Sequence, residues 1–237
     1  MNYIAIILTA LIPVAVLLVY IYRKDRIAPE PVGQLFKAFA LGVLAAPLSL
    51  CISSPLEAMG LFVQDAQTIE DCVRISFFGA AIPEELAKLF ILWLVLRKNR
   101  YFDEKMDGIV YAVCVSLGFA AIENLLYLFS DAESFMSIGI SRALFAIPGH
   151  FCFGILMGYY YSLAKFCPSE SKKNSIFVVL APVLVHGAYD TILFVSDVAA
   201  GLSGVLTLLF LWLCYKMWKY GSKKIAEHLE RDNVVQI

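Results

Sequence analysis

Residues 75–96 read ISFFGAAIPEELAKLFILWLVL, an apolar run long enough to cross a bilayer that carries Glu84, Glu85 and Lys88 near its middle. A membrane-spanning helix needs about 20 predominantly apolar residues. Ionisable side chains inside such a helix are costly, so they mark a candidate functional site. Glu84 and Glu85 precede Lys88 by four and three residues, so one helix face would offer one ammonium to two carboxylates. This stretch predicts either a pair of carboxylates poised for acid–base chemistry or a structural ion pair.

The composition of the whole chain is that of a membrane protein. Of its 237 residues, 60% are hydrophobic and 16% are charged, and the mean hydropathy is +0.76. A soluble domain contains about 45–50% apolar residues. Seven runs are long enough to span a bilayer. They are Tyr3–Tyr22, Leu35–Ile52, Ile75–Leu96, Gly108–Phe129, Ala143–Leu163, Ile176–Val195 and Val198–Met217.

These runs predict an all-α, polytopic membrane protein with about seven transmembrane helices and no soluble domain. We expect a single domain over residues 1–237, with its core helices at about residues 75–195. Basic residues follow the first, third, fifth and seventh runs, whereas the loops between them are acidic. Because loops rich in Lys and Arg stay in the cytoplasm, the N-terminus is expected outside and the C-terminus inside. The first run lacks preceding basic residues, so it is expected to remain as an anchor and not to be a cleaved signal peptide.

Charge and cysteine content exclude several other classes. A net charge of −1 argues against sequence-independent binding to nucleic acid. The apolar composition makes the lipid bilayer the expected surroundings of the chain. Six cysteines show no CxxC spacing, which argues against a zinc ribbon or a redox motif. Cys51 and Cys72 would both lie near the outer face, where a disulfide is feasible in an oxidising compartment. The sequence leaves open whether these two cysteines are bridged or free.

Two further apolar runs carry polar groups close to small residues. Residues 118–127, GFAAIENLLY, place Glu123 beside Asn124, after residues small enough to let membrane helices approach closely. Residues 148–158, PGHFCFGILMG, place His150 one turn before a GxxxG face. Taken singly, the asparagine also fits interhelical hydrogen bonding, and the histidine fits a buried structural role.

A fourth run supplies a histidine–carboxylate pair. Residues 181–190, APVLVHGAYD, place His186 four residues before Asp190. A carboxylate one helical turn away can accept an imidazole N–H and so orient the ring. Glu84, His150 and His186 each lie about ten to twelve residues into their helices, roughly 15–18 Å, which is near the membrane midplane. Glu123 and Asp190 lie closer to the outer ends of their helices, so the four runs predict a cavity that leads from the midplane towards the extracytoplasmic side.

Four motifs occur in order along these runs: Glu84-Glu85-x-x-Lys88, Phe119-x-x-x-Glu123-Asn124, His150, and His186-x-x-x-Asp190. Together they resemble the PrsW family of intramembrane proteases, over residues 83–190. The resemblance implies a multi-pass peptidase of the bacterial plasma membrane, related to the type II CAAX prenyl proteases of the CPBP superfamily and to the scaffold subunit of gamma-secretase. It also implies that the substrate is a single-span membrane protein, an anti-sigma factor, cut first near its extracytoplasmic side.

The resemblance further implies roles for the matched residues. In the related prenyl proteases a Glu and a His activate water, while a second His and an Asn stabilise the oxyanion. By motif position Glu84 is the expected general base, and Lys88 would neutralise the Glu84–Glu85 pair. Asp190 stands where the asparagine is expected, and Glu123 where the first histidine is. An ionised aspartate repels an oxyanion, so Asp190 is expected to orient a histidine. The remaining oxyanion donors are His186, His150 and Asn124.

We expect no metal or other cofactor in this mechanism. The alternative is a zinc peptidase with ligands among His150, His186, Glu84 and Glu123, although HExxH is absent. A second alternative is a non-catalytic scaffold, which would need fewer costly buried groups. A proton-coupled transporter would more often show an inverted repeat.

Overall fold

The computed structural model describes residues 3–25 and 28–235, and that part of the chain is folded into helices and short connections. The helices are α1 (Tyr3–Lys24), α2 (Val32–Val43), α3 (Ala45–Ala58), α4 (Ile69–Arg74), α5 (Ile82–Leu96), α6 (Lys105–Ser130), α7 (Phe135–Ser141), α8 (Ile147–Phe166), α9 (Ser171–Val198) and α10 (Ser203–Val235). Two π-helical segments, η1 (Ile75–Ala81) and η2 (Arg142–Ala146), lead into α5 and α8. Two short 3-10 turns, η3 (Pro168–Glu170) and η4 (Ala200–Leu202), precede α9 and α10.

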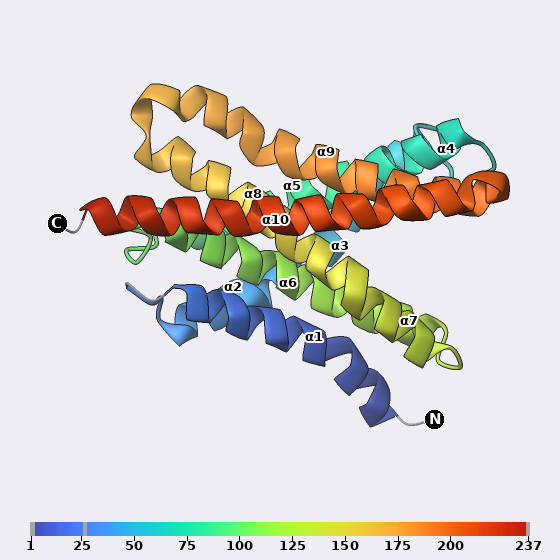
Figure 1. Ribbon diagram of the computed structural model, residues 1–237, viewed down its shortest axis with the longest axis horizontal. Helices are drawn as coiled ribbons and strands as arrows, with labels where there is room; N and C mark the ends of the chain where they lie inside the picture. Colours follow the sequence, from blue (N-terminus) through green and yellow to red (C-terminus); the bar gives the residue numbers. More distant parts are fainter. Residues whose placement is uncertain (1–2, 26–27, 236–237) are drawn as a thin grey trace.

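Helix α6 lies at the centre of the bundle (Figure 1). Helices α1, α2, α5, α8 and α10 all contact it. Its residues are buried around most of its circumference, from Met106 to Leu128. A helix that is apolar on all sides is typical of such a central position. Because Glu123 is on this helix, the fold places that carboxylate inside the bundle.

The all-α, multi-pass architecture predicted from the sequence is confirmed. Among the described residues, six helical segments are long and apolar enough to cross a membrane. They are Tyr3–Lys24, Val32–Ala58, Lys105–Ser130, Phe135–Phe166, Pro168–Val198 and Ala200–Asn233. The predicted run 75–96 is also helical, through η1 and α5, but its three central charges lower its hydropathy.

The two ends of the bundle differ in charge. Figure 1 shows the N-terminus and the C-terminus at opposite ends of the long axis, as an odd number of crossings requires. The α5–α6 and α8–α9 connections lie at the end where α1 and α10 finish, which we call the basic end. The α3–α4, α6–α7 and α9–α10 connections lie at the other, acidic end. The alternation of charged loops along the sequence therefore corresponds to two separate faces of the molecule.

Helix α10 differs from the segment predicted for it. It begins at Ser203 and continues to Val235, whereas the apolar run was expected to end at Met217. The extension is too polar for a membrane span, but it packs at the basic end. There Asp232 accepts the backbone N–H groups of Lys105 (3.1 Å) and Met106 (2.8 Å) and so caps the first turn of α6.

The two cysteines near the acidic end are free. Cys51 is exposed on α3, and Cys72 is buried on α4. The Ser76 hydroxyl donates to the Cys72 carbonyl (2.6 Å), which joins α4 to the π-helical turn that follows. Because Cys51 and Cys72 are both free, no disulfide between them links α3 to α4.

Close backbone contact between α6 and α8 depends on glycine. A Cβ atom on Gly158 would lie 2.2 Å from the Gly108 carbonyl oxygen. The Gly154–Gly158 face therefore packs within the chain, as expected for a GxxxG face in a single polytopic protein.

Gly158→Ala is expected to lower the melting temperature of the detergent-solubilised protein, because the methyl group has no space between two backbones. Overpacking of this kind typically destabilises by about 1–3 kcal/mol. The matched control is Gly204→Ala, where a Cβ would meet nothing within 4 Å. That control should be neutral or slightly stabilising, since alanine favours helix. Equal melting temperatures for the two variants would contradict the predicted close contact.

Two buried carboxyl groups lie at the basic end, between the first two spans. Asp25 and Glu30 are 2% and 3% exposed. The Glu30 N–H donates to Asp25 Oδ2 (3.3 Å), and the Tyr111 hydroxyl donates to Glu30 Oε2 (2.5 Å). Burial outweighs these hydrogen bonds and raises the pKa of Asp25 to about 6 and the pKa of Glu30 to about 7.

The raised pKa values make stability depend on pH. The folded protein binds these protons more tightly than the unfolded chain does. The contribution of Asp25 and Glu30 to the stability of the fold is therefore largest below about pH 4, and it is lost as the pH rises towards 7. The melting temperature in detergent should therefore fall between pH 5 and pH 8, and Glu30→Gln should flatten that dependence. Glu57→Gln, at an exposed position of α3, should leave the slope unchanged. Identical slopes for the Glu30 variant and the wild type would contradict the expectation.

Candidate active site

Seven of the eight site residues predicted from the sequence form, with Arg142, one network of hydrogen bonds and ion pairs, and the eighth, Asn124, is attached to it through Arg142. We call this network the polar cluster. Its members are Glu84, Glu85, Lys88, Glu123, Arg142, His150, His186 and Asp190. They come from α5, α6, η2, α8 and α9, so the fold brings together groups up to about 100 residues apart, as in the His186–Glu85 contact at a separation of 101.

The helices that carry Glu84 and His150 start in the same way. Each follows a π-helical turn and has proline as its second residue, Pro83 in α5 and Pro148 in α8. Proline has no N–H to donate to the preceding turn, and a π turn changes which carbonyl is left without a partner. Such turns occur frequently at functional sites. Glu84 and His150 therefore lie in the first turn after a break in the regular helix.

Lys88 lies at the centre of the polar cluster. Its side chain is 1% exposed, and its Nζ donates to Glu84 Oε2 (3.2 Å) and Glu85 Oε1 (2.9 Å). The third contact is with His150 Nδ1, at 3.2 Å. The ammonium also lies 4.1 Å from the centre of the Phe119 ring. An ammonium has three N–H donors, so all three have acceptors here.

The contact with Lys88 determines the tautomer of His150. Because an ammonium only donates, His150 Nδ1 must accept and cannot carry a hydrogen. The hydrogen is then on Nε2, which donates to Glu123 Oε2 at 2.8 Å. Both ring nitrogens of His150 are therefore engaged.

His186 lies between two carboxylates. Its Nδ1 is 2.9 Å from Glu85 Oε1, and its Nε2 is 3.2 Å from Asp190 Oδ2. Two carboxylate partners are satisfied when both ring nitrogens carry hydrogen. The ring stacks on Phe153 with centroids 4.5 Å apart. Asp190 thus holds the ring in the orientation that the i, i+4 spacing predicted.

Arg142 belongs to the site although it was not among the predicted site residues. Its Nη2 donates to Glu123 Oε2 and its Nε to Asn124 Oδ1, both at 2.7 Å. The guanidinium also lies 4.0 Å from the centre of the Tyr127 ring. The sequence did hold a signal, since an arginine directly before an apolar run meets the same criterion as the other intramembrane charges.

Asn124 is placed differently from the other predicted site residues. Its side chain is fully buried, and its Nδ2 donates to the Ala10 carbonyl of α1 at 2.9 Å. With its Oδ1 bound by Arg142, the amide connects α1, α6 and η2. Asn124 is therefore outside the cavity and supports the residues that face it.

A cavity of about 440 Å³ opens beside the polar cluster. The acidic, basic and histidine side chains on its wall are Glu84, Glu123, Arg142, His150, His186 and Asp190. Its remaining wall is largely apolar and includes Tyr189, Leu206 and Phe210. The lining residues come from the parts of α6, α9 and α10 nearest the acidic end, so the cavity leads from the middle of the bundle towards that end.

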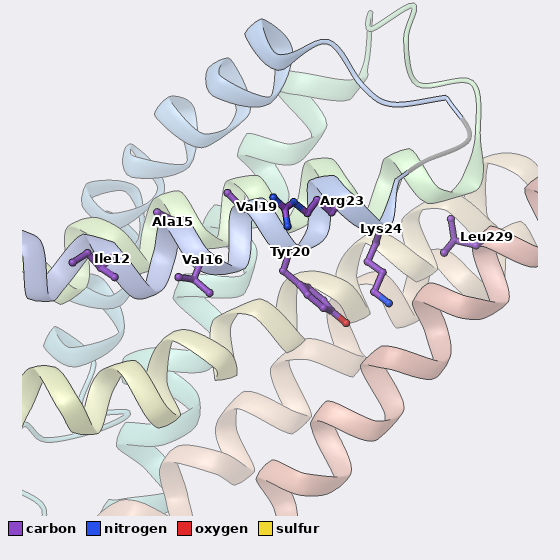
Figure 2. A pocket seen from close by; sticks show the side chains of 8 residues that line it. All are labelled: Ile12, Ala15, Val16, Val19, Tyr20, Arg23, Lys24 and Leu229. Carbon is purple, nitrogen blue, oxygen red and sulfur yellow. The ribbon is translucent and has the colours of Figure 1, made fainter.

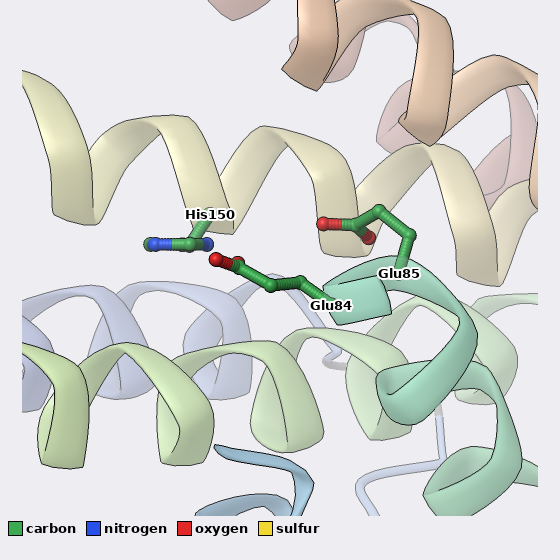
Figure 3. Close-up of side chains that lie close together, drawn as sticks. All are labelled: Glu84, Glu85 and His150. Carbon is green, nitrogen blue, oxygen red and sulfur yellow. The ribbon is translucent and has the colours of Figure 1, made fainter. Parts of the chain in front are cut away.

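Glu84 is the carboxylate of its helix that faces the cavity. Figure 3 shows Glu84 and Glu85 pointing from α5 towards the helix that carries His150. Glu85 is enclosed by Lys88 and His186, whereas the Glu84 side chain is 15% exposed and lines the cavity. Four carboxylates face two permanent cations and His186, so one negative charge remains when His186 is protonated. Glu84 is therefore the carboxylate of α5 that a molecule in the cavity would meet.

Fold and site together define a multi-pass membrane enzyme with a carboxylate–histidine centre enclosed by its helices. The profile of the family described as "PrsW family intramembrane metalloprotease" matches residues 30–215. The chain therefore belongs to the PrsW family and is an intramembrane peptidase.

Named relatives agree with this assignment. The chain is 35% identical to "Protease PrsW" of Clostridioides difficile (strain 630) over 96% of this chain and 93% of the relative. It is 31% identical to "Protease PrsW" of Bacillus subtilis (strain 168), over 98% and 99% of the two chains. The protein of the same name from Oceanobacillus iheyensis is 38% identical, over 76% and 79%. No solved structure matches the chain.

The family description names a metalloprotease, and a metal site would need several donor atoms close together with free lone pairs. Glu84, Glu85 and His150 have donor atoms within 4.8 Å of one another. The Lys88 ammonium already contacts all three, in the position that a cation would need. A histidine ligand must also offer a free nitrogen lone pair. Both nitrogens of His150 and of His186 are engaged as described above, so this arrangement does not fit a metal ion.

Proposed function

We propose that the chain is a glutamate-type intramembrane endopeptidase in which Glu84 activates water and no metal takes part. The observation that carries the proposal is the position of Glu84 on the cavity wall, with its Oε2 3.9 Å from His186 Nε2. A water molecule in the cavity beside these two groups would meet a proton acceptor and an N–H donor together. This is the geometry that general-base attack on a carbonyl requires.

The reaction then follows from these groups. Glu84 takes a proton from water as the water oxygen bonds to the scissile carbonyl carbon. The carbonyl oxygen gains negative charge, which the Arg142 N–H groups not bound to Glu123 or Asn124 would stabilise, together with the His186 Nε2–H that it would share with Asp190. The C–N bond breaks as Glu84 returns the proton to the leaving amine. Asp190 and Glu123 orient the donors, and Lys88 and Glu85 orient Glu84 and His186.

We propose as substrate a single-span membrane protein of the anti-sigma-factor type in the bacterial plasma membrane. The family resemblance supports this substrate class, and the bacterial relatives support the bacterial membrane. The cavity leads towards the acidic end, which the charge rule places outside the cytoplasm. A cut near the extracytoplasmic side of the substrate helix would therefore suit this orientation.

The test is cleavage of a co-expressed single-span anti-sigma-factor reporter tagged at both ends. Wild type and His186→Ala are compared at equal levels of inserted enzyme, and the purified wild type is assayed for bound zinc. The proposal expects loss of the cut fragment in the variant, with cleavage by the wild type that persists after a zinc chelator. One zinc per chain together with chelator-sensitive cleavage would instead support the zinc peptidase, and unchanged fragment levels would exclude catalysis at this site.

A further inference from the structure

A second hollow lies on the outside of the bundle, between α1 and the end of α10. It measures about 860 Å³, and we call it the α1–α10 groove. It is lined by Ile12, Ala15, Val16, Val19, Tyr20, Arg23, Lys24 and Leu229 (Figure 2). None of these residues belongs to the polar cluster, and the mechanism leaves the groove without a role.

The α1 wall of the groove is an apolar stripe that ends in two basic residues. Ile12, Val16 and Val19 are about half exposed, and their spacing puts them on one helix face. Arg23 and Lys24 continue this wall at the basic end and are exposed. The polarity therefore changes along the groove, from apolar near mid-membrane to cationic at the end.

The α10 wall carries matching features. Trp218 and Leu229 are eleven residues apart, three helical turns, and so share one face of α10. The rings of Trp218 and Tyr20 lie 5.9 Å apart, which places an aromatic pair beside the groove. Figure 2 shows Tyr20 and Lys24 pointing from α1 into the space that Leu229 borders. Tyr and Trp at such a position are typical of the membrane–water interface.

The length of the groove matches one leaflet of a bilayer. Eleven residues separate Ile12 from Arg23, which is roughly 16 Å of helix at 1.5 Å per residue. Half of a hydrocarbon core of about 30 Å has a similar depth. An acyl chain along the stripe would therefore bring its headgroup to the level of Arg23 and Lys24.

We propose that the α1–α10 groove binds one anionic phospholipid of the leaflet at the basic end, with its phosphate at Arg23 and Lys24. The apolar stripe fits an acyl chain, and the basic residues complement a headgroup with net negative charge. A zwitterionic lipid fills the same apolar space but offers no net charge to the two cations. The groove is thus selective for lipid charge and is separate from the peptidase site.

Trp218 provides a fluorescent probe beside the groove. The variant Trp93→Phe/Trp212→Phe retains Trp218 alone and is reconstituted in vesicles with lipids brominated on the acyl chain, which quench tryptophan on contact. Brominated phosphatidylglycerol is compared with brominated phosphatidylcholine at equal mole fraction. Each basic residue near a headgroup favours anionic lipid by about fivefold, so phosphatidylglycerol should occupy the site roughly tenfold or more in preference. The variant Trp93→Phe/Trp218→Phe reports bulk lipid at the exposed Trp212 and should show no such preference.

Three further variants distinguish the effect of charge from the effect of apolar space. Arg23→Gln/Lys24→Gln should abolish the preference at Trp218, whereas Arg23→Lys/Lys24→Arg should keep it. Ala15→Phe fills the apolar stripe without changing charge and should also abolish it. Equal quenching by the two lipids in the single-tryptophan protein would overturn the proposal, as would a preference that survives both the glutamine and the phenylalanine variants.

Discussion

Glu84→Gln is expected to reduce cleavage of the single-span reporter by about 10²- to 10⁴-fold, the range over which a general base contributes. Glutamine has nearly the same size and can still accept a hydrogen bond from Lys88, so the fold is retained. It is not basic enough to take a proton from water. The amount of cut fragment at equal enzyme levels measures the effect.

The control for this prediction is Glu70→Gln, the same chemical change at an exposed position of α4 whose side chain is 73% exposed. The control should cleave at the wild-type rate, because Glu70 pairs with Arg74 at the surface, outside the polar cluster. If Glu84→Gln retains more than about a tenth of wild-type cleavage, Glu84 is not the general base, since a lost base has a larger effect.

Much of the fold could be predicted because a membrane imposes a simple pattern. Apolar runs of sufficient length identified the helices, and the charges between them identified which loops share an end. Boundaries were less accurate where other forces decide them. The end of α10 is polar and lies beyond any hydropathy signal, and it is helical because Asp232 and buried side chains such as Ile225 pack at the basic end.

The candidate site could be predicted as a set of residues but not as a geometry. Spacing within one helix indicated the Glu84–Lys88 and His186–Asp190 contacts, because residues four apart share a face. Contacts between helices depend on how the helices are rotated, which spacing does not give. The His150–Lys88 contact and the inclusion of Arg142 are of this kind. The family resemblance supplied the expected roles of the site residues. The hydrogen bonds that engage both ring nitrogens of His150 and His186 leave no lone pair for a metal ion, and sequence spacing could not indicate them.

Lys88→Met is expected to cause the largest loss of stability among single substitutions at the site. The side chain is 1% exposed, and its removal leaves Glu84, Glu85 and His150 Nδ1 without their shared donor. Breaking a buried ion pair by removing one partner typically destabilises by about 3–5 kcal/mol, because the remaining charge is buried and unpaired. We expect a strongly lowered melting temperature in detergent, or failure to accumulate. Lys223→Met, whose side chain is 72% exposed, should change stability by no more than about 0.5 kcal/mol.

A double-mutant cycle separates lost charge pairing from lost packing. Glu85→Gln/Lys88→Met removes both the ammonium and one of the charges that it neutralises. If the Lys88–Glu85 pair at 2.9 Å carries the effect, the double variant should be more stable than the sum of the single variants predicts, by about 0.5–3 kcal/mol. Additive losses would mean that the packing of the buried lysine side chain matters more than its pairing with Glu85. Non-additive losses would mean that Lys88 is the cation around which the carboxylates and His150 are arranged.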